Sequence, residues 1–369
     1  MEIRANRLDR AFYLHQAEYE EAALRVLRSG RYVLGDELNR FEKEFAAYLG
    51  GGHCVGLASG LDALWITFRL LGIGKGDEVI VQGNTYIASV MGITLNEATP
   101  VFAEPDVHYA MDADELETLL TPRTKAVLVT HLYGMMTKMQ PIVDFCRKHG
   151  LYLVEDCAQA HGCKDEGKAA GTFGDVGCFS FYPTKNLGAF GDGGAVWTSS
   201  KELAERFRVF RNYGSEKKYH NCVQGANSRL DELQAALLRV KLRHLDSLNE
   251  QKRQIAVRYL QEIHNPAIVL PKPAIGTENV WHQFVICCRQ RDTLAAFLKE
   301  RGIGTQIHYP IPPHLAEAYR YLNIEKGTLP KTEILAEQVL SLPSYIGLTP
   351  EEQSEIIRAI NDFSLEKDI

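Results

Sequence analysis

The stretch Ala126-Val-Leu-Val-Thr130 decides the fold class, because it is a short apolar segment between two segments with helical patterns. The periodicity predicts helices over residues 112–119 and 141–149, and a further strand over residues 151–155. A strand made almost entirely of apolar residues is typical of a parallel sheet that helices cover on both faces. We therefore predict an α/β fold built on a large, mostly parallel sheet.

The same alternation extends outward in both directions. Upstream, we expect helices over residues 18–28, 38–49, 62–71 and 86–96, and strands over residues 53–57, 78–81 and 101–103. Downstream, apolar stretches at residues 177–181 and 194–197 precede a helical pattern from residue 231 to about residue 260 that contains no Gly or Pro. We predict that this long helix ends the larger domain.

A smaller α+β unit follows the proline-rich residues 265–273. We expect it to contain a strand over residues 282–288 and helices over residues 292–301, 331–340 and 350–360. At roughly 150 residues per domain, a chain of 369 residues is long enough for two domains. The prediction is a large α/β domain over residues 1–250 and a small C-terminal α+β domain over residues 251–369.

The composition argues against several classes of protein. The net charge is −6, so no overall positive field attracts a nucleic acid polymer or an anionic membrane. No apolar run reaches the roughly 18 to 20 residues that a membrane span needs. The eight cysteines form no C-x-x-C pair and the histidines form no H-E-x-x-H motif, which argues against a bound metal. We expect buried thiols, no metal and a cytoplasmic location.

Three glycine-containing segments are candidates for binding a phosphate group. Residues 72–77 follow a helix and precede a strand, the reverse of the order that a dinucleotide loop needs, and residues 188–194 precede no helix. Ala58-Ser-Gly-Leu-Asp62 lies between a strand and a helix, so Ser59 can cap the helix while the N–H groups of Gly60 and Leu61 bind an anion. A plain helix cap would also explain this segment.

An acid and a lysine follow two later strands. Asp156 lies where a strand ends, at the carboxyl edge of the sheet, which is where open α/β sheets bind ligands. Lys185 ends the aromatic, hydroxyl-rich run Phe179-Ser-Phe-Tyr-Pro-Thr-Lys185. The two could form a simple salt bridge. Together with the Ser59 segment, however, they match what pyridoxal phosphate needs: an amine for its aldehyde, a carboxylate for its ring nitrogen and donors for its phosphate.

Short motifs along the whole chain occur in the order of one known family. They are Ala58-Ser-Gly60, Gly76-Asp-Glu-Val79, Asn84-Thr-Tyr86, Glu155-Asp156, Ala158-Gln-Ala-His-Gly162, Phe179-Ser180, Lys185-Asn186, Gly191-Asp-Gly-Gly194, Asn227-Ser-Arg-Leu-Asp231 and Gln234-Ala-Ala236. In these motifs the chain resembles the DegT-type nucleotide-sugar aminotransferases, which are pyridoxal phosphate enzymes of fold type I. The resemblance implies an aspartate aminotransferase-like fold, with a mixed, mostly parallel sheet in the large domain and a smaller α+β C-terminal domain.

The resemblance also implies roles for the cofactor-binding residues. Lys185 would bind the cofactor and move the proton during transamination, Asp156 would pair with the ring nitrogen, and Gln159 would bind the ring hydroxyl. Tyr86 would stack on the ring, although a core position is the alternative for this tyrosine. The phosphate would be held by Ser59, Gly60, Leu61 and Ser180 and by Asn227 of the opposing subunit, so the family position of Asn227 implies a homodimer with shared active sites.

Two longer segments narrow the resemblance to a substrate class. Arg211-Asn-Tyr-Gly-Ser-Glu-Lys-Lys218 and Gln306-Ile-His-Tyr-Pro-Ile-Pro-Pro-His314 are most similar to enzymes that aminate carbon 3 of TDP-3-keto-6-deoxyhexoses. The residues that match the family's substrate contacts are Tyr182, Lys217, Arg229, Arg253, His308 and Tyr309. For Lys217 and Arg253, a solvated surface charge is an equally good interpretation.

The function implied is transfer of an amino group from L-glutamate, which leaves 2-oxoglutarate, to a TDP-linked 3-keto-6-deoxyhexose. The alternative is amination of carbon 4 of a 4-keto sugar, which the residues do not exclude. A sugar dehydratase is disfavoured because that branch of the family replaces the lysine by histidine. A non-catalytic regulator is disfavoured because Lys185 and Asp156 are both present.

Overall fold

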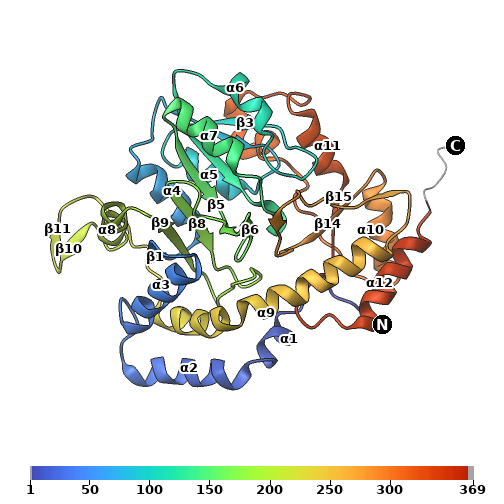
Figure 1. The fold of residues 1–369 in the computed structure, drawn as a ribbon, viewed down its shortest axis with the longest axis horizontal. Coiled ribbons are helices and arrows are strands. Elements are labelled where there is room, and N and C mark those ends of the chain that lie inside the picture. The colour runs from blue at the N-terminus through green and yellow to red at the C-terminus, as the bar shows by residue number, and fades with distance from the viewer. Residues whose placement is uncertain (1, 365–369) are drawn as a thin grey trace.

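The computed structural model describes residues 2–364, and its centre is a seven-stranded sheet (Figure 1). The strands are β1 (His53–Leu57), β2 (Glu78–Gln82), β3 (Thr99–Ala103), β4 (Thr124–Thr130), β5 (Tyr152–Asp156), β8 (Val176–Ser180) and β9 (Gly194–Thr198), in the order β1-β9-β8-β5-β4-β2-β3. The pairs β2–β3, β2–β4, β4–β5 and β5–β8 are parallel, while β9 is antiparallel to both β8 and β1. The predicted mixed, mostly parallel sheet is confirmed.

The carboxyl ends of β1, β4, β5 and β8 lie at one edge of this sheet. β1 runs in the same direction as β8, because each is antiparallel to the strand β9 between them. The register places Leu57 and Ser180 on either side of Gly194, and Thr130 beside Asp156. Segments that follow four different strands can therefore meet at this edge.

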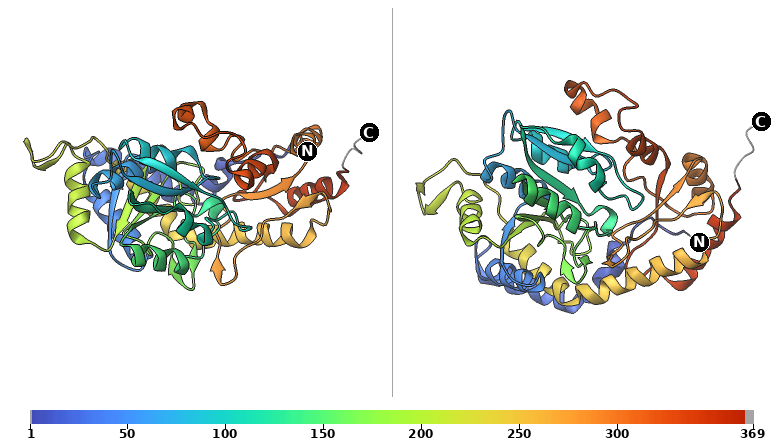
Figure 2. Two further views of the ribbon diagram at one scale, coloured as in Figure 1. Left: turned by 90° about the horizontal axis from the view of Figure 1, so that it is seen from above. Right: turned by 45° about the horizontal axis from the view of Figure 1, so that its top comes forward.

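Helices cover both faces of the sheet, as Figure 2 shows. In β4, Ala126 and Leu128 pack against one core and Val127 and Val129 against another, because successive residues of a strand point to opposite faces. The first core includes α4 (Gly60–Leu70), α5 (Ile87–Thr94) and α8 (Lys201–Phe210), and the second includes α3 (Asp36–Tyr48), α7 (Gln140–His149) and part of α9 (Glu232–Glu262). This double cover explains why the strand has no exposed face and reads as almost entirely apolar.

A separate hydrophobic core, in the C-terminal part of the chain, forms around the three-stranded antiparallel sheet β12-β14-β15. Its elements are β12 (Ile268–Val269), β14 (Phe284–Cys288), β15 (Val339–Leu342), α10 (Arg291–Glu300), α11 (Pro330–Gln338) and α12 (Pro350–Asp362). The 31-residue helix α9 joins the two units, since its first half contributes Leu238 and Leu245 to the large core and its second half contributes Ile255 and Tyr259 to this one. The division at residue 250 stays a prediction.

Several local features differ from the sequence-based expectations. The helix predicted over residues 331–340 ends at Gln338, and strand β15 begins at the next residue. Ile3 pairs with Ile303 and lies in the core of the C-terminal unit, a contact between distant parts of the chain. Cys222 is exposed, so the expectation of buried thiols is wrong for this one residue. No helix within residues 2–364 is long and apolar enough to cross a membrane.

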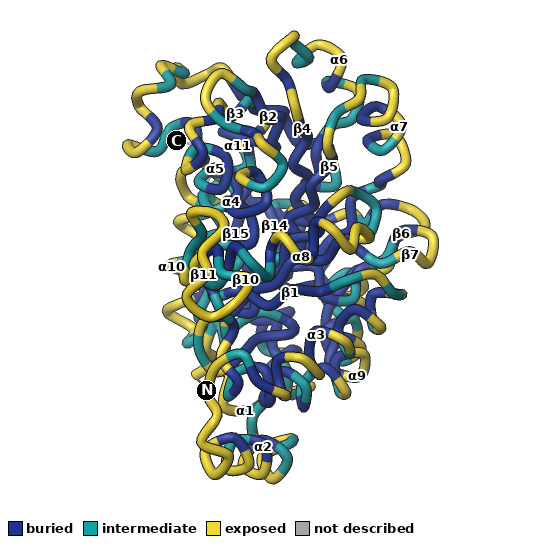
Figure 3. Tube along the Cα trace, turned by 90° about the vertical axis from the view of Figure 1, so that its left-hand side faces the viewer, coloured by how far each residue is buried: buried dark blue, intermediate teal, exposed yellow. Residues whose placement is uncertain are grey.

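The remaining α-helices and strands complete the fold. They are α1 (Leu8–Tyr13), α2 (Gln16–Ser29), α6 (Leu116–Leu119), the small sheet of β6 (Lys164–Asp165), β7 (Lys168–Ala169) and β13 (Thr277–Glu278), and the hairpin of β10 (Ser215–Lys217) and β11 (His220–Asn221). The β10–β11 hairpin projects from the body of the molecule (Figure 1), and its residues 216–221 are exposed (Figure 3).

Candidate active site

Lys185 lies in the loop between β8 and β9, at the carboxyl edge of the sheet. Its backbone N–H donates to the carbonyl of Tyr182 at 2.8 Å, which closes a tight turn. Burial lowers the pKa of the Lys185 amine to about 8, and the charge of Asp156 opposes part of that shift. Because the unprotonated amine is the nucleophile, this pKa leaves a larger share of Lys185 reactive near neutral pH than an exposed lysine would have.

Asp156 is the last residue of β5 and is buried. Its Oδ2 accepts a hydrogen bond from the hydroxyl of Ser89 at 2.7 Å, and its Oδ1 accepts one from the backbone N–H of Ala158 at 3.1 Å. Burial raises the pKa of the Asp156 carboxyl, while these two hydrogen bonds and the charge of Lys185 lower it. The carboxylate is thus held in one orientation, facing the positive charge of the lysine.

Ser89 belongs to a buried group of hydroxyls that the sequence interpretation did not include. Thr85 Oγ1 lies 2.7 Å from Ser89 Oγ and 3.0 Å from Thr130 Oγ1. Ser89 has no exposed surface, although it lies on α5, whose sequence is Ile-Ala-Ser-Val-Met-Gly-Ile-Thr. A hydroxyl inside such an apolar helix was the available signal, because a buried hydroxyl needs a hydrogen-bond partner.

A second carboxylate, Glu155, supports the strand end from the other side. Glu155 is fully buried and accepts hydrogen bonds from the backbone N–H groups of Gly171 at 2.8 Å and Phe173 at 2.7 Å. The ring of His131 lies 3.0 Å from the same carboxylate. Neighbouring residues of a strand point to opposite faces, so Glu155 fixes the loop behind β5 while Asp156 faces the site.

Ser59 and Ser180 meet around Gly60. The Ser59 hydroxyl accepts a hydrogen bond from the N–H of Asp62 at 3.0 Å, which confirms the predicted cap of α4. A Cβ atom at Gly60 would lie only 2.5 Å from the Cβ of Ser180, so only glycine permits this approach. The N–H groups of Gly60 and Leu61 are in the first turn of α4, where they have no partner within the helix. Two hydroxyls and a helix N-terminus therefore converge in a cup that suits a phosphate group.

Gln159 and the tyrosines Tyr86, Tyr133 and Tyr309 form a connected group near the end of β5. The Gln159 side chain donates to the hydroxyl of Tyr309 at 3.1 Å and accepts from the backbone N–H of Tyr133 at 2.5 Å. The rings of Tyr86 and Tyr309 are tilted, with centroids 4.9 Å apart. The Tyr133 hydroxyl donates to the carbonyl of His308. Tyr86 is 49% exposed, so it is not a core residue, and its stacking on a cofactor ring stays a prediction.

Three of the predicted ligands lie on or beside the β10–β11 hairpin of their own chain. Lys217 is exposed on β10. Arg229 donates to the side chain of Asn212 at 3.1 Å, at the base of the hairpin. Asn227 is exposed, while the next residue, Ser228, donates to Asp62 at 2.7 Å. Within one chain, the structure does not bring Lys217 or Arg229 to Lys185.

The other two predicted substrate ligands lie in different surroundings. Arg253 is half-buried on α9 and donates to Glu250 of the same helix at 2.8 Å. Tyr182 is 53% exposed and lies in the loop that carries Lys185. Arg253 therefore already has an anionic partner, whereas the Tyr182 ring is accessible beside the candidate site.

The residues present fit pyridoxal phosphate. The hydroxyls of Ser59 and Ser180 and the free N–H groups at the start of α4 suit a phosphate, and Gly60 permits this close approach because a Cβ there would collide with Ser180. Asp156 offers a fixed carboxylate for a ring nitrogen, and Lys185 offers an amine whose pKa is lowered to about 8. These groups come from the ends of different strands and meet at one edge of the sheet.

Comparison with known proteins identifies the family. The model of the DegT/DnrJ/EryC1/StrS aminotransferase family matches residues 14–361. The chain belongs to this family. The predicted family, fold and aminotransferase activity are thereby confirmed, and pyridoxal phosphate, the cofactor of these aminotransferases, is the cofactor of this chain.

Two curated relatives and one crystal structure are similar over almost the whole chain. The dTDP-3-amino-3,6-dideoxy-alpha-D-galactopyranose transaminase of Aneurinibacillus thermoaerophilus is 49% identical, over 95% of this chain and 96% of its own. The dTDP-3-amino-3,4,6-trideoxy-alpha-D-glucose transaminase of Streptomyces venezuelae is 48% identical, over 95% and 93%. The crystal structure of S. venezuelae DesV in complex with a ketimine intermediate superposes with a TM-score of 0.96 at 48% identity and covers 98% of both chains.

The residues of this chain have separate tasks in the aminotransferase site. Bound pyridoxal phosphate supplies a reactive aldehyde and a ring that withdraws electrons from the carbon next to the substrate nitrogen. The Lys185 amine is the group that can bond to the aldehyde and, once released, carry a proton. Asp156 would keep a negative charge against the ring nitrogen, and Ser89 holds that carboxylate in place. Ser59, Gly60 and Ser180 would hold the phosphate.

Proposed function

We propose that this aminotransferase transfers the amino group of L-glutamate to carbon 3 of a TDP-linked 3-keto-6-deoxyhexose. The product would be a TDP-3-amino-3,6-dideoxyhexose. Two relatives at 48% and 49% identity are named for dTDP-3-amino sugars, which supports this reaction. The observation that carries the proposal is the position of Tyr309, whose hydroxyl accepts from Gln159 and whose ring lies against those of Tyr86 and His308.

His308 and Tyr309 have surroundings that suit the recognition of sugar hydroxyls. His308 Nδ1 lies 2.7 Å from the Ser341 hydroxyl and its Nε2 lies 2.9 Å from the Gln283 side chain. Burial lowers the pKa of His308 to about 4, so the ring is neutral at pH 7. The Tyr309 hydroxyl would discriminate between sugars by hydrogen bonds, because a mismatched hydroxyl leaves a buried donor or acceptor unpaired. Both ring nitrogens of His308 already have partners, so His308 would bind a sugar hydroxyl only in place of Ser341 or Gln283. Tyr182 would contribute a second hydroxyl.

We further propose a homodimer in which each active site uses residues of both chains. The β10–β11 hairpin projects from the body with Tyr213, Tyr219 and Val223 exposed, and exposed apolar side chains on a protruding segment are typical of an interface. In such a dimer, Asn227 would bind the cofactor phosphate of the partner, and Lys217 and Arg229 would reach its nucleotide diphosphate. Arg253 would join them only by leaving Glu250.

Mixed dimers test the shared site. Lys185→Ala chains and Asn227→Ala chains should each be inactive or nearly so, but a mixture should regain part of the activity, because one hybrid site then keeps both groups. Mixing Lys185→Ala with itself is the control. Full activity of a monomer in analytical ultracentrifugation would contradict this arrangement.

The position of amination is tested with a panel of substrates. The purified enzyme is incubated with L-glutamate and with 3-keto and 4-keto TDP-sugars, and the products are identified by mass spectrometry and NMR. We expect kcat/KM to be higher for the 3-keto sugar. An equal or higher value for the 4-keto isomer would replace carbon 3 by carbon 4, and loss of water without amino transfer would indicate a dehydratase.

The cellular location is also a proposal. All eight cysteines are free thiols, seven of them buried. Thiols in this number persist in a reducing compartment, so we place the enzyme in the cytoplasm. A fractionation experiment with an antibody against the chain would test this placement.

A further inference from the structure

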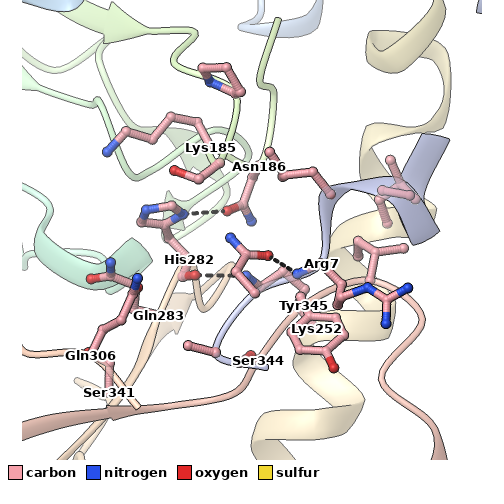
Figure 4. Close-up of a pocket in the computed structure, with 18 of the residues that line it drawn as sticks. Arg7, Lys185, Asn186, Lys252, His282, Gln283, Gln306, Ser341, Ser344 and Tyr345 are labelled. Carbon is pink, nitrogen blue, oxygen red and sulfur yellow. Dashed lines mark hydrogen bonds between the residues drawn. The ribbon is translucent and has the colours of Figure 1, made fainter. Parts of the chain in front are cut away.

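A cavity of about 160 Å³ lies beside the loop that carries Lys185 (Figure 4). Six separate parts of the chain line it: residues within 5–11, residues 183–186 of the Lys185 loop, helix α9, residues 282–283 before β14, residues 306 and 308, and residues within 341–346 at and after the end of β15. The cavity therefore lies between the large and the small unit. The cofactor and sugar ligands discussed above, apart from Lys185 and His308, do not line it.

The charges around this cavity are all of one sign. Its lining includes Arg7, Lys185, Lys241 and Lys252, and no Asp or Glu among the described residues lines it. Lys252 is buried, and its amine donates a hydrogen bond to the carbonyl of His282 at 2.7 Å. An ammonium group has three donors, so this contact uses only one of them. Arg7 is paired with Asp9 and Lys185 feels the charge of Asp156, whereas no carboxylate is paired with Lys241 or Lys252 among the ion pairs of the described residues.

Lys241, also on α9, is another buried lysine, about three helical turns before Lys252. Its amine donates to the carbonyl of Gly188 at 3.3 Å, and burial lowers the pKa of Lys241 to about 8. Burial and the neighbouring charge of Lys241 lower the pKa of Lys252 to about 7. The charge of Lys241 disfavours that of Lys252, and an anion near the Lys252 amine would stabilise its charged form.

Two hydroxyls that line the same cavity lack partners. Ser344 Oγ and Tyr345 OH are buried and have no hydrogen-bond partner in the described part of the chain, although buried hydroxyls are normally paired. Both can donate a hydrogen bond. A ligand that accepts hydrogen bonds and carries negative charge would therefore satisfy the lysines and the hydroxyls together.

We propose that this cavity binds a carboxylate of the amino donor and of the 2-oxo acid formed from it. The volume suits a small acid and is well below the roughly 300 to 1,000 Å³ of pockets that hold larger ligands, which argues against a nucleotide sugar here. Lys185 is one of the lining residues, so the cavity borders the loop that carries the reacting amine. The identity of the acid as L-glutamate rests on the proposed function, whereas the carboxylate subsite rests on the lining itself.

Glutarate is the probe, because it has two carboxylates but no amino or keto group and so cannot react. Its dissociation constant is measured by calorimetry on the cofactor-loaded enzyme, next to those of butyrate and inorganic phosphate. We expect glutarate to bind more tightly than either. In Lys252→Met, which keeps the length of the side chain but not its charge, glutarate should bind about tenfold more weakly or worse.

Two further variants complete the design. Ser344→Ala removes one unpaired hydroxyl and should weaken glutarate binding severalfold, with little risk to folding. Lys201→Met, an exposed lysine at the start of α8, is the matched control and should bind glutarate as the unchanged enzyme does. In steady-state assays, Lys252→Met should raise KM for L-glutamate and leave KM for the nucleotide sugar unchanged.

The outcomes separate this proposal from the proposed function. Equal binding of glutarate to Lys252→Met and to the unchanged enzyme, or equal binding of inorganic phosphate, overturns the carboxylate subsite, whereas equal binding of butyrate shows that the cavity holds one carboxylate only. A rise in KM for the nucleotide sugar instead of L-glutamate also overturns it. Failure of the enzyme to aminate any keto sugar overturns the proposed function alone, because glutarate binding requires no turnover.

Discussion

Asp156 and Lys252 are both buried charged groups, but their surroundings differ. Asp156 accepts hydrogen bonds from Ser89 and from the N–H of Ala158, and it faces the positive charge of Lys185. Lys252 donates to one carbonyl, and its nearest charged influence is another lysine. The first group is oriented by the chain itself, whereas the second keeps unused donors. A group that serves a permanently bound cofactor is therefore fully hydrogen-bonded by the chain itself, whereas a group that serves a transient anion keeps donors without partners.

The physical reason lies in how each charge is stabilised. A buried charge costs free energy unless hydrogen bonds or an opposite charge compensate it. Asp156 meets this requirement through side chains that are part of the fold, so it remains fixed whichever substrate is bound. Lys252 meets it only in part, so the protein without an anion is expected to favour the neutral amine, and an anion is expected to restore the charge.

Replacement of Lys185 should have the largest effect on this comparison. Lys185→Ala removes the amine that bonds to the cofactor and moves the proton, so turnover should be abolished and the absorbance of the lysine-bound cofactor should disappear. The folded structure should remain, which circular dichroism measures. Lys201→Ala is the control, and any retained turnover in Lys185→Ala would show that the reacting amine has been misassigned.

Replacement of Asp156 should have the next largest effect. Asp156→Asn keeps the shape and can still accept from Ser89, but it removes the negative charge that stabilises a protonated ring nitrogen. Loss of one such electrostatic contact typically costs about 10² to 10³ in kcat. Steady-state kinetics and the visible spectrum measure the effect, with the exposed Asp144→Asn as control. A kcat within a factor of about two of the unchanged enzyme would contradict the role of Asp156.

The parts of this site that the sequence could predict are those fixed by strand order. Asp156 ends one short strand and Ser59 closely follows another, and a parallel sheet brings the carboxyl ends of such strands together. Lys185 could be chosen because its neighbours are aromatic and hydroxyl-bearing. The two faces of β4 were also predictable, since its residues 126–129 are all apolar and such a segment must be covered on both faces.

The parts that could not be predicted depend on packing between distant segments. Lys252 and Arg253 are adjacent cations on one long helix, and only the contact with the C-terminal unit decides that Lys252 is buried while Arg253 pairs with Glu250. Ile3 reaches Ile303 across most of the chain length, and no local pattern encodes that pairing. The resemblance therefore led to Arg253, whereas the cavity is lined by its neighbour.

Ser89 sharpens the comparison from the side of Asp156. In Ser89→Ala, Asp156 loses a hydrogen bond to its charged oxygen, and such bonds contribute about 1.5 to 3 kcal/mol, so kcat should fall by roughly ten- to a hundredfold. Because Ser89 lowers the pKa of Asp156, its loss should raise that pKa and move the acid limb of the kcat profile to higher pH. Ser89→Thr should keep more activity than Ser89→Ala if the hydroxyl can still reach. A lower kcat with an unmoved pH profile would reduce Ser89 to a packing residue.

Lys252 tests the other side of the comparison through stability. Burial lowers the pKa of Lys252 to about 7, whereas an unfolded lysine has a pKa of about 10.4. Between these two values the unfolded chain binds the extra proton, so the contribution of Lys252 to the free energy of unfolding increases as pH rises through this window. From about pH 6 to about pH 8 the increase should be about 1 kcal/mol, and Lys252→Met should lack it. Chemical unfolding of both proteins at the two pH values, in buffer free of carboxylates, measures the difference.

Glutarate should reduce this pH dependence in the unchanged enzyme, because an anion in the cavity raises the pKa of the amine that it contacts. An identical pH dependence in Lys252→Met would show that the buried amine is not the source.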